Sequence, residues 1–144
     1  MANSIAIGVA YQDQDIIGAN IVSSNAVYAI ERLGYTNGAY GTVTQSGNKA
    51  SPVTLNKTAG TITTTNAQMA PNAEVAFVVT NSQVSALDTV IVNIASGATA
   101  TFAYVVAVVT VTDGAFTINL SNISNNAYTD TLKINFAILH VLPA

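Results

Sequence analysis

Apolar and polar residues alternate along much of the second half of the chain, and this pattern is typical of β-strands that bury one face. The alternation is clearest in residues 115–122 (AFTINLSN) and 131–139 (TLKINFAIL). Residues 75–80 (VAFVVT) and 89–94 (TVIVNI) are instead nearly continuous apolar runs. Such runs favour central strands that are buried on both faces.

A threonine-rich stretch, residues 53–69 (VTLNKTAGTITTTNAQM), alternates in the same way. Threonine suits a strand because its β-branched carbon packs on the sheet while its hydroxyl reaches water. The stretch predicts two strands, at about residues 53–56 and 60–65, which are separated by a turn.

The dipeptide Asp113-Gly114 lies between the apolar run 102–112 and the alternating segment 115–122. Both central residues of a two-residue type I′ turn need positive φ, and Asp-Gly is one of the dipeptides that meets this need. The sequence therefore predicts a β-hairpin at this point.

The region before residue 50 is compatible with two interpretations. Residues 27–35 (VYAIERLGY) fit a helix that is capped by Ser24 and ends at Gly34. They also fit a strand that pairs across Asn37-Gly38 with residues 39–45. We favour the strand, because Asn-Gly between two apolar runs is the stronger local signal.

Gaps rich in Gly, Asn, Asp and Ser recur about every ten residues, which is typical of a sandwich or a barrel. The predicted fold is therefore all-β: an antiparallel β-sandwich, jelly-roll-like or Greek key, over residues 25–144, with an extended N-terminal arm over residues 1–24. Its core is expected to contain Phe77, Val79, Val90, Val92, Phe102, Val106, Val108, Phe116, Ile118, Leu120, Ile134 and Phe136.

The arm is more hydrophobic than a free tail should be in water. We expect it to add a strand to the sheet edge of a neighbouring subunit or to lie along a seam between subunits, where its backbone groups find partners. The alternative is that it folds back as the first strand of its own sandwich. The candidate contact residues of the arm are Ile5, Ile7, Val9, Ile16, Ile17, Ile21 and Val22.

Charge is scarce in this chain of 144 residues: 8% of them are charged, against about 25% in a typical soluble domain. The formal net charge is −3, and the basic residues Arg32, Lys49, Lys57 and Lys133 are scattered, which argues against nucleic-acid binding. The most apolar stretch, residues 102–111, is about half as long as a membrane span. With no recognisable export signal, we expect a protein made in the cytoplasm without a membrane partner.

Low charge also favours self-association, because interface cores are depleted of Lys, Glu and Asp. Neutral threonine and asparagine faces can hydrogen-bond across a subunit boundary without the desolvation cost of buried ions. We therefore expect a homo-oligomer. The alternative is a monomer whose neutral surface has no partner.

Candidate chemistry is sparse. His140 is the only histidine, and no nucleophile elbow accompanies it, so we interpret it as a surface or interface residue. Asp13 and Asp15 could form half of a calcium site, but two acids are too few by themselves, and a solvated turn is the favoured interpretation. There are no cysteines and no glycine-rich phosphate loop. We expect no catalytic residue, no metal and no cofactor, and hence no enzyme.

Residues 41–139 contain a series of short motifs, which follow one another along the chain. They are VTLNK at 53–57, GTIT at 60–63, Asn66-Ala67, VAF at 75–77, TNS at 80–82, DTVIVN at 88–93, Ser96-Gly97 and NFA at 135–137. This part of the chain is similar to a module of bacteriophage structural proteins, particularly head decoration or cement proteins.

The resemblance implies a β-sandwich in the virion, on the outer face of the capsid, made in the host cytoplasm. It implies a homo-oligomer, with a trimer favoured, that clamps adjacent subunits of the major capsid protein. The alternative is a tail or fibre module that binds a host surface carbohydrate. Tyrosines that could stack on sugars are Tyr11, Tyr28, Tyr35, Tyr40, Tyr104 and Tyr128.

Overall fold

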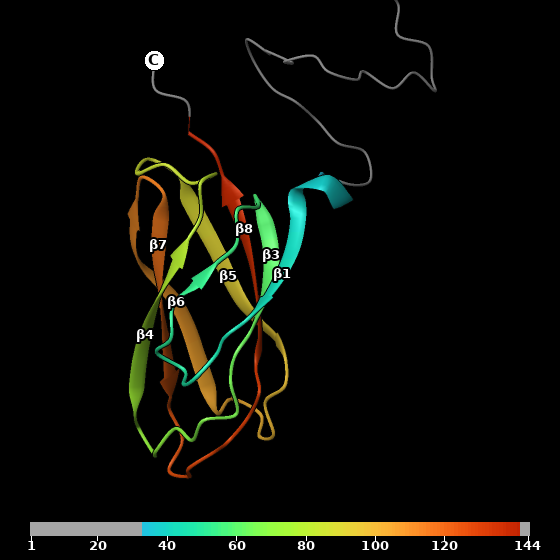
Figure 1. Ribbon diagram of the computed structural model, residues 1–144. Coiled ribbons are helices and arrows are strands. Elements are labelled where there is room, and N and C mark those ends of the chain that lie inside the picture. The colour runs from blue at the N-terminus through green and yellow to red at the C-terminus, as the bar shows by residue number, and fades with distance from the viewer. Residues whose placement is uncertain (1–32, 142–144) are drawn as a thin grey trace, which may run out of the picture. The chain divides into compact units, whose positions relative to one another are not determined.

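Turns rich in Gly, Asn and Ser divide the chain into short strands, as the sequence predicts. The computed structural model describes residues 33–141, which form a β-sandwich (Figure 1). Its strands are β1 (Tyr40–Thr44), β2 (Val53–Thr54), β3 (Ala59–Thr63), β4 (Glu74–Thr80), β5 (Thr89–Ser96), β6 (Tyr104–Thr112), β7 (Ala115–Asn122) and β8 (Lys133–Leu139), and a 3-10 turn η1 (Asn37–Ala39) precedes them.

Each sheet has four strands. The first sheet has the order β1-β3-β8-β5, and the second has the order β2-β4-β7-β6. From β3 onward every pair is antiparallel, with β3 and β5 flanking β8, and β4 and β6 flanking β7. The antiparallel pairs β3–β8 and β4–β7 are nested, and such winding is typical of Greek-key and jelly-roll folds.

The predicted antiparallel β-sandwich is confirmed, except that two of its strand pairs are parallel. β1 pairs with β3 in parallel, and β2 pairs with β4 in parallel. The chain crosses from one sheet to the other after β1 and again after β2, and each crossing reverses its direction. Strands two steps apart in sequence therefore run the same way when they become neighbours.

The core lies between the sheets and agrees with the alternation in the sequence. Its largest cluster contains Phe77, Phe116, Ile118, Ile134 and Phe136, all nearly inaccessible to solvent. A second cluster surrounds Met69, Tyr104, Leu120 and Leu132. Val79 and Val90 are also buried as predicted, and Val92, Val106 and Val108 pack against the core while partly exposed.

Phe102 is the exception among the predicted core residues. Its side chain is 88% exposed and its φ is +59°. It lies before β6 rather than within it, and Ala103 and Tyr104 take the inward positions instead. The alternating pattern placed Phe102 on the buried face of a strand. The chain instead bends at this residue, and the strand begins only at Tyr104.

The prediction that residues 75–80 and 89–94 are buried on both faces is also wrong. Alternate residues of β4 and β5 are exposed, including Val78 and Ile91. Within residues 33–141, each sheet covers only the inner face of the other, and β5 is an edge strand of its sheet. The outward apolar side chains of β4 and β5 therefore do not contribute to the core between the sheets.

The predicted hairpin at Asp113-Gly114 is confirmed, since β6 and β7 pair with Thr112 opposite Ala115. The turn is not type I′, however. Gly114 has a φ of +79°, whereas Asp113 is not among the described residues with positive φ. Only one position of this turn thus depends on the freedom of glycine.

The hairpin predicted across Asn37-Gly38 is wrong. These residues form η1, and residues 33–36 contain no strand or helix. β1 pairs with β3 instead. The rest of the segment 27–35, the arm 1–24 and the boundary at residue 25 lie outside the described residues.

Candidate interaction surfaces

The single histidine pairs with a buried aspartate that is distant in sequence. His140 Nδ1 lies 3.0 Å from Asp88 Oδ2, and the Asp88 side chain is only 1% exposed. The Asp88 carboxylate also accepts hydrogen bonds from the backbone N–H groups of Ser85 (2.8 Å) and Val141 (2.9 Å). The pair therefore ties the end of β8 to the loop between β4 and β5.

The bonds to Asp88 determine its titration. Burial alone would raise the pKa of this carboxyl group, but the hydrogen bonds from Ser85, Val141 and His140 outweigh it and lower the pKa from 3.8 to about 2. A depressed pKa means that the folded protein binds a proton less readily than the unfolded chain does. Asp88 therefore stabilises the fold at pH values above its ordinary pKa.

We expect the domain to lose about 2 kcal/mol of stability as the pH falls from about 4 to about 2, because Asp88 becomes protonated over this range. Urea unfolding at several pH values measures the loss. Asp88→Asn is the control, and its stability should depend less steeply on pH over this range. The Asn variant keeps some slope because hydrogen bonds from Thr99 also lower the pKa of Asp130 against the effect of burial. Equal slopes for both proteins would contradict the assignment.

A buried lysine connects two loops at the other end of the sandwich. The Lys49 ammonium group donates hydrogen bonds to the hydroxyl of Thr64 and to the backbone carbonyls of Thr65 and Asp130. Burial lowers the pKa of Lys49, and the nearby Asp130 partly offsets this effect. The amine is therefore fully used in holding the loop 45–52 against the loop that precedes β8.

Within residues 33–141, neither a serine hydroxyl bonded to His140 nor a cluster of metal-binding side chains accompanies the His140–Asp88 pair. The backbone N–H of Ser85 binds the Asp88 carboxylate, and no serine hydroxyl bonds to His140 within residues 33–141. Across the same residues, no three His, Cys, Asp or Glu side chains cluster so that they could hold a metal ion. Asp13 and Asp15 lie outside the described residues. No helix in the described part of the chain is long and apolar enough to span a membrane.

The outer faces of both sheets are almost free of charge. Among the strand residues that the structure describes, only Glu74 and Lys133 are charged, and each begins its strand. On the second sheet, Val78 lies beside Thr117, and Asn119 lies between Ala76 and Ala107. This face is therefore a surface of small neutral side chains.

The first sheet carries a polar ladder on its outer face. The Thr61 hydroxyl donates to Asn135 Oδ1 at 2.6 Å, so it accepts the hydrogen bond from the Tyr40 hydroxyl at 2.8 Å. Tyr35 also donates its hydroxyl hydrogen to the carbonyl of Ile138. The polar groups of this face thus bond to one another without any ion.

The tyrosines do not gather into one aromatic platform among the described residues. Tyr104 is buried, and its ring packs against that of the half-buried Tyr128, with centroids 6.1 Å apart. Tyr35 and Tyr40 each expose slightly less than half of their surface to solvent. Tyr11 and Tyr28 lie outside the described residues.

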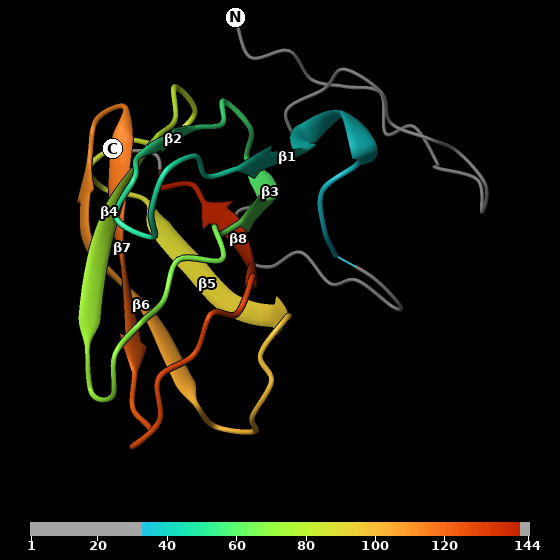
Figure 2. The ribbon, with the colours of Figure 1, turned by 60° about the horizontal axis from the view of Figure 1, so that its bottom comes forward.

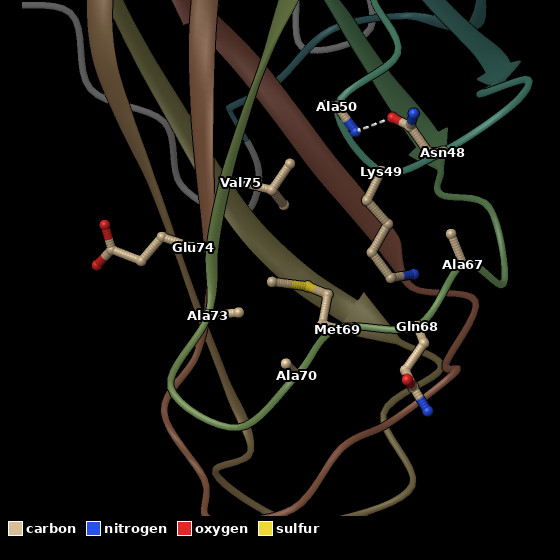
Figure 3. Close-up of a pocket in the computed structure, with 10 residues that line it drawn as sticks. All are labelled: Asn48, Lys49, Ala50, Ala67, Gln68, Met69, Ala70, Ala73, Glu74 and Val75. Atoms are coloured by element: carbon tan, nitrogen blue, oxygen red, sulfur yellow. Dashed lines mark hydrogen bonds between the residues drawn. The ribbon is translucent and has the colours of Figure 1, made fainter.

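A groove opens beside the first residues of β4 (Figure 3). We call it the Met69 groove; it has a volume of about 270 Å³ and is lined by Asn48, Lys49, Ala50, Ala67, Gln68, Met69, Ala70, Ala73, Glu74 and Val75. Two segments that are separate in sequence, residues 48–50 and 67–75, form its walls. Sequence patterns predict strands one at a time, so they gave no signal of this groove.

The candidate contact residues of the arm, from Ile5 to Val22, lie outside the described residues. Comparisons of the chain with protein-family models, curated proteins and solved structures return no match. The function must therefore be inferred from the residues and the geometry of this chain.

Proposed function

We propose that this protein is a structural component of a bacteriophage virion, which decorates the outer face of the head and clamps adjacent subunits of the major capsid protein. The observation that carries this proposal is the lack of charge on both outer faces, where Glu74 and Lys133 are the only charged residues in the strands of the described range 33–141. Another protein can cover such a face without desolvating ions. The resemblance of residues 41–139 to decoration proteins supports the choice of partner.

Clamping also fits the separation of the core from the outer faces. The core residues all lie between the sheets, so the outward residues such as Val78 and Ile91 are free to contact other proteins. A homo-oligomer, with a trimer favoured, would present several such faces to the shell at once. Individually weak contacts then add to strong binding through effective concentration.

We expect a phage head stripped of this protein to rupture at a lower temperature than the intact head, and purified protein to restore the original temperature. The physical reason is that each bound oligomer would link subunits that separate when the shell breaks. Release of the packaged DNA on heating measures the effect. Heads that rupture at the same temperature with and without the protein would exclude the decoration role.

The tail or fibre alternative has its own readout. Purified protein on a glycan array should show no specific binding if the proposed role is correct. Saturable binding to one class of glycan, together with unchanged rupture of stripped heads, would favour the alternative.

A further inference from the structure

An exposed aromatic ring occupies one end of the sandwich, in the loop between β5 and β6. Phe102 has a positive φ, which is a strained conformation for a bulky side chain, and its ring is almost fully exposed. Unfavourable backbone geometry that places an apolar ring in water suggests a function for that ring. We call this ring the Phe102 knob.

The surrounding structure holds the knob in place. Asp130 accepts hydrogen bonds from both the backbone N–H and the hydroxyl of Thr99, at 2.9 and 2.5 Å. Ala103 is buried in the core and its N–H bonds to the carbonyl of Ala100. The loop is thus fixed on both sides of Phe102, so the ring loses little freedom when it binds a partner.

The Met69 groove has the size and character that such a ring requires. An enclosed cavity of about 150 Å³ binds benzene. The groove has about 270 Å³ but opens to solvent, so a phenyl ring in it would keep one side in water. Met69, Ala70, Ala73 and Val75 supply apolar atoms to it (Figure 3). The groove can therefore take up one phenyl ring.

The charges at the groove do not oppose a neutral ring. Figure 3 shows the Glu74 side chain pointing away from the other lining residues. The Lys49 amine is bonded to Thr64, Thr65 and Asp130. The loop 97–103 (GATATFA) carries no charged side chain. Insertion of the ring into the groove would therefore bury no unpaired charge.

Knob and groove do not touch within one molecule, because the Phe102 side chain is 88% exposed and is not among the residues that line the groove. The loop that carries Phe102 and the turn before β4 lie on opposite sides of the same end of the sandwich in both views (Figures 1 and 2). Across the second sheet, β7 separates the start of β4 from β6. A contact between the two features requires a second copy of the chain.

We propose that the Phe102 knob of one copy inserts into the Met69 groove of the next, so that identical chains associate head to tail. A head-to-tail contact forms a closed ring when the rotation between copies allows it. One phenyl ring buries about 150–250 Å², less than a stable interface needs. The exposed Val105 and Ile123 near the knob can contribute further area, and the N–H of Ile123 bonds to the carbonyl of Ala103.

This inference rests on the self-association in the proposed function, and sedimentation of the purified full-length chain at micromolar concentration tests it. Wild type should have a mass near three times the 14.8 kDa of one chain, at low and at molar salt alike. Phe102→Ala removes the knob, and Ala70→Trp fills the groove. Each should raise the dissociation constant at least about thirtyfold, as expected for an interface hot spot. Leu87→Ala, an exposed control in the loop between β4 and β5, should leave the mass unchanged.

A mixture of the two variants identifies the head-to-tail arrangement. Phe102→Ala keeps its groove and Ala70→Trp keeps its knob, so one intact contact remains and the mixture should form one-to-one dimers. Circular dichroism verifies folding, and Ala70→Leu replaces the Trp variant if that variant does not fold. Variants that keep the wild-type mass, or a mixture that stays monomeric, would overturn the head-to-tail contact alone. A monomeric wild type would overturn both this contact and the self-association in the proposed function.

Discussion

Phe116→Ala should lower the free energy of unfolding by about 3–5 kcal/mol, the range observed when a buried phenylalanine is truncated. Phe116 is 1% exposed and belongs to β7 in the second sheet. Its ring lies 5.3 Å from that of Phe136, which belongs to β8 in the first sheet. The substitution therefore leaves a cavity where the two sheets are in contact.

Phe102→Ala provides a control with the same chemical change. The Phe102 ring is exposed, so its removal creates no cavity and should change the stability of the monomer by less than about 0.5 kcal/mol. Urea unfolding at a protein concentration that keeps both variants monomeric measures the difference. Similar losses for the two variants would contradict the burial of one ring and the exposure of the other.

Gly97→Ala should destabilise the domain by about 2–5 kcal/mol, because a left-handed conformation and overpacking both add to the cost. Gly97 has a φ of +98° and lies where β5 and the segment before β8 diverge. A Cβ atom there would be 2.1 Å from the carbonyl oxygen of Thr131 and 3.0 Å from the Cα of Leu132. Both are backbone atoms, so the segment before β8 would have to move.

Gly114→Ala separates the two contributions. Gly114 also has positive φ, but a Cβ atom added there would meet nothing within 4 Å. Only the conformational cost of about 1–2 kcal/mol should remain. Thermal or urea unfolding of both variants compares them, and a Gly114→Ala variant that loses as much stability as Gly97→Ala would exclude the clash with Thr131.

Local sequence determines most of the strands of this protein. The alternation in residues 115–122 predicts β7 and its buried face, because successive side chains of a strand point to opposite sides. The Asp-Gly dipeptide locates the hairpin between β6 and β7, although the turn type differs from the prediction. The scarcity of charge likewise predicts the neutral outer faces, since any folding of this composition leaves few ions for the surface.

The tertiary structure alone decides which strands become neighbours and what gathers between them. The parallel pairs β1–β3 and β2–β4 depend on how the chain crosses between the sheets. The residues of these four strands do not by themselves indicate that crossing. The pair of His140 and Asp88 joins residues that are 52 positions apart. The Met69 groove likewise requires the loop between β1 and β2 to meet the segment that leads into β4, and the exposure of Phe102 depends on one bend before β6. Periodicity describes neighbours along the chain, whereas packing free energy is minimised over the whole molecule, so these features follow only from the complete fold.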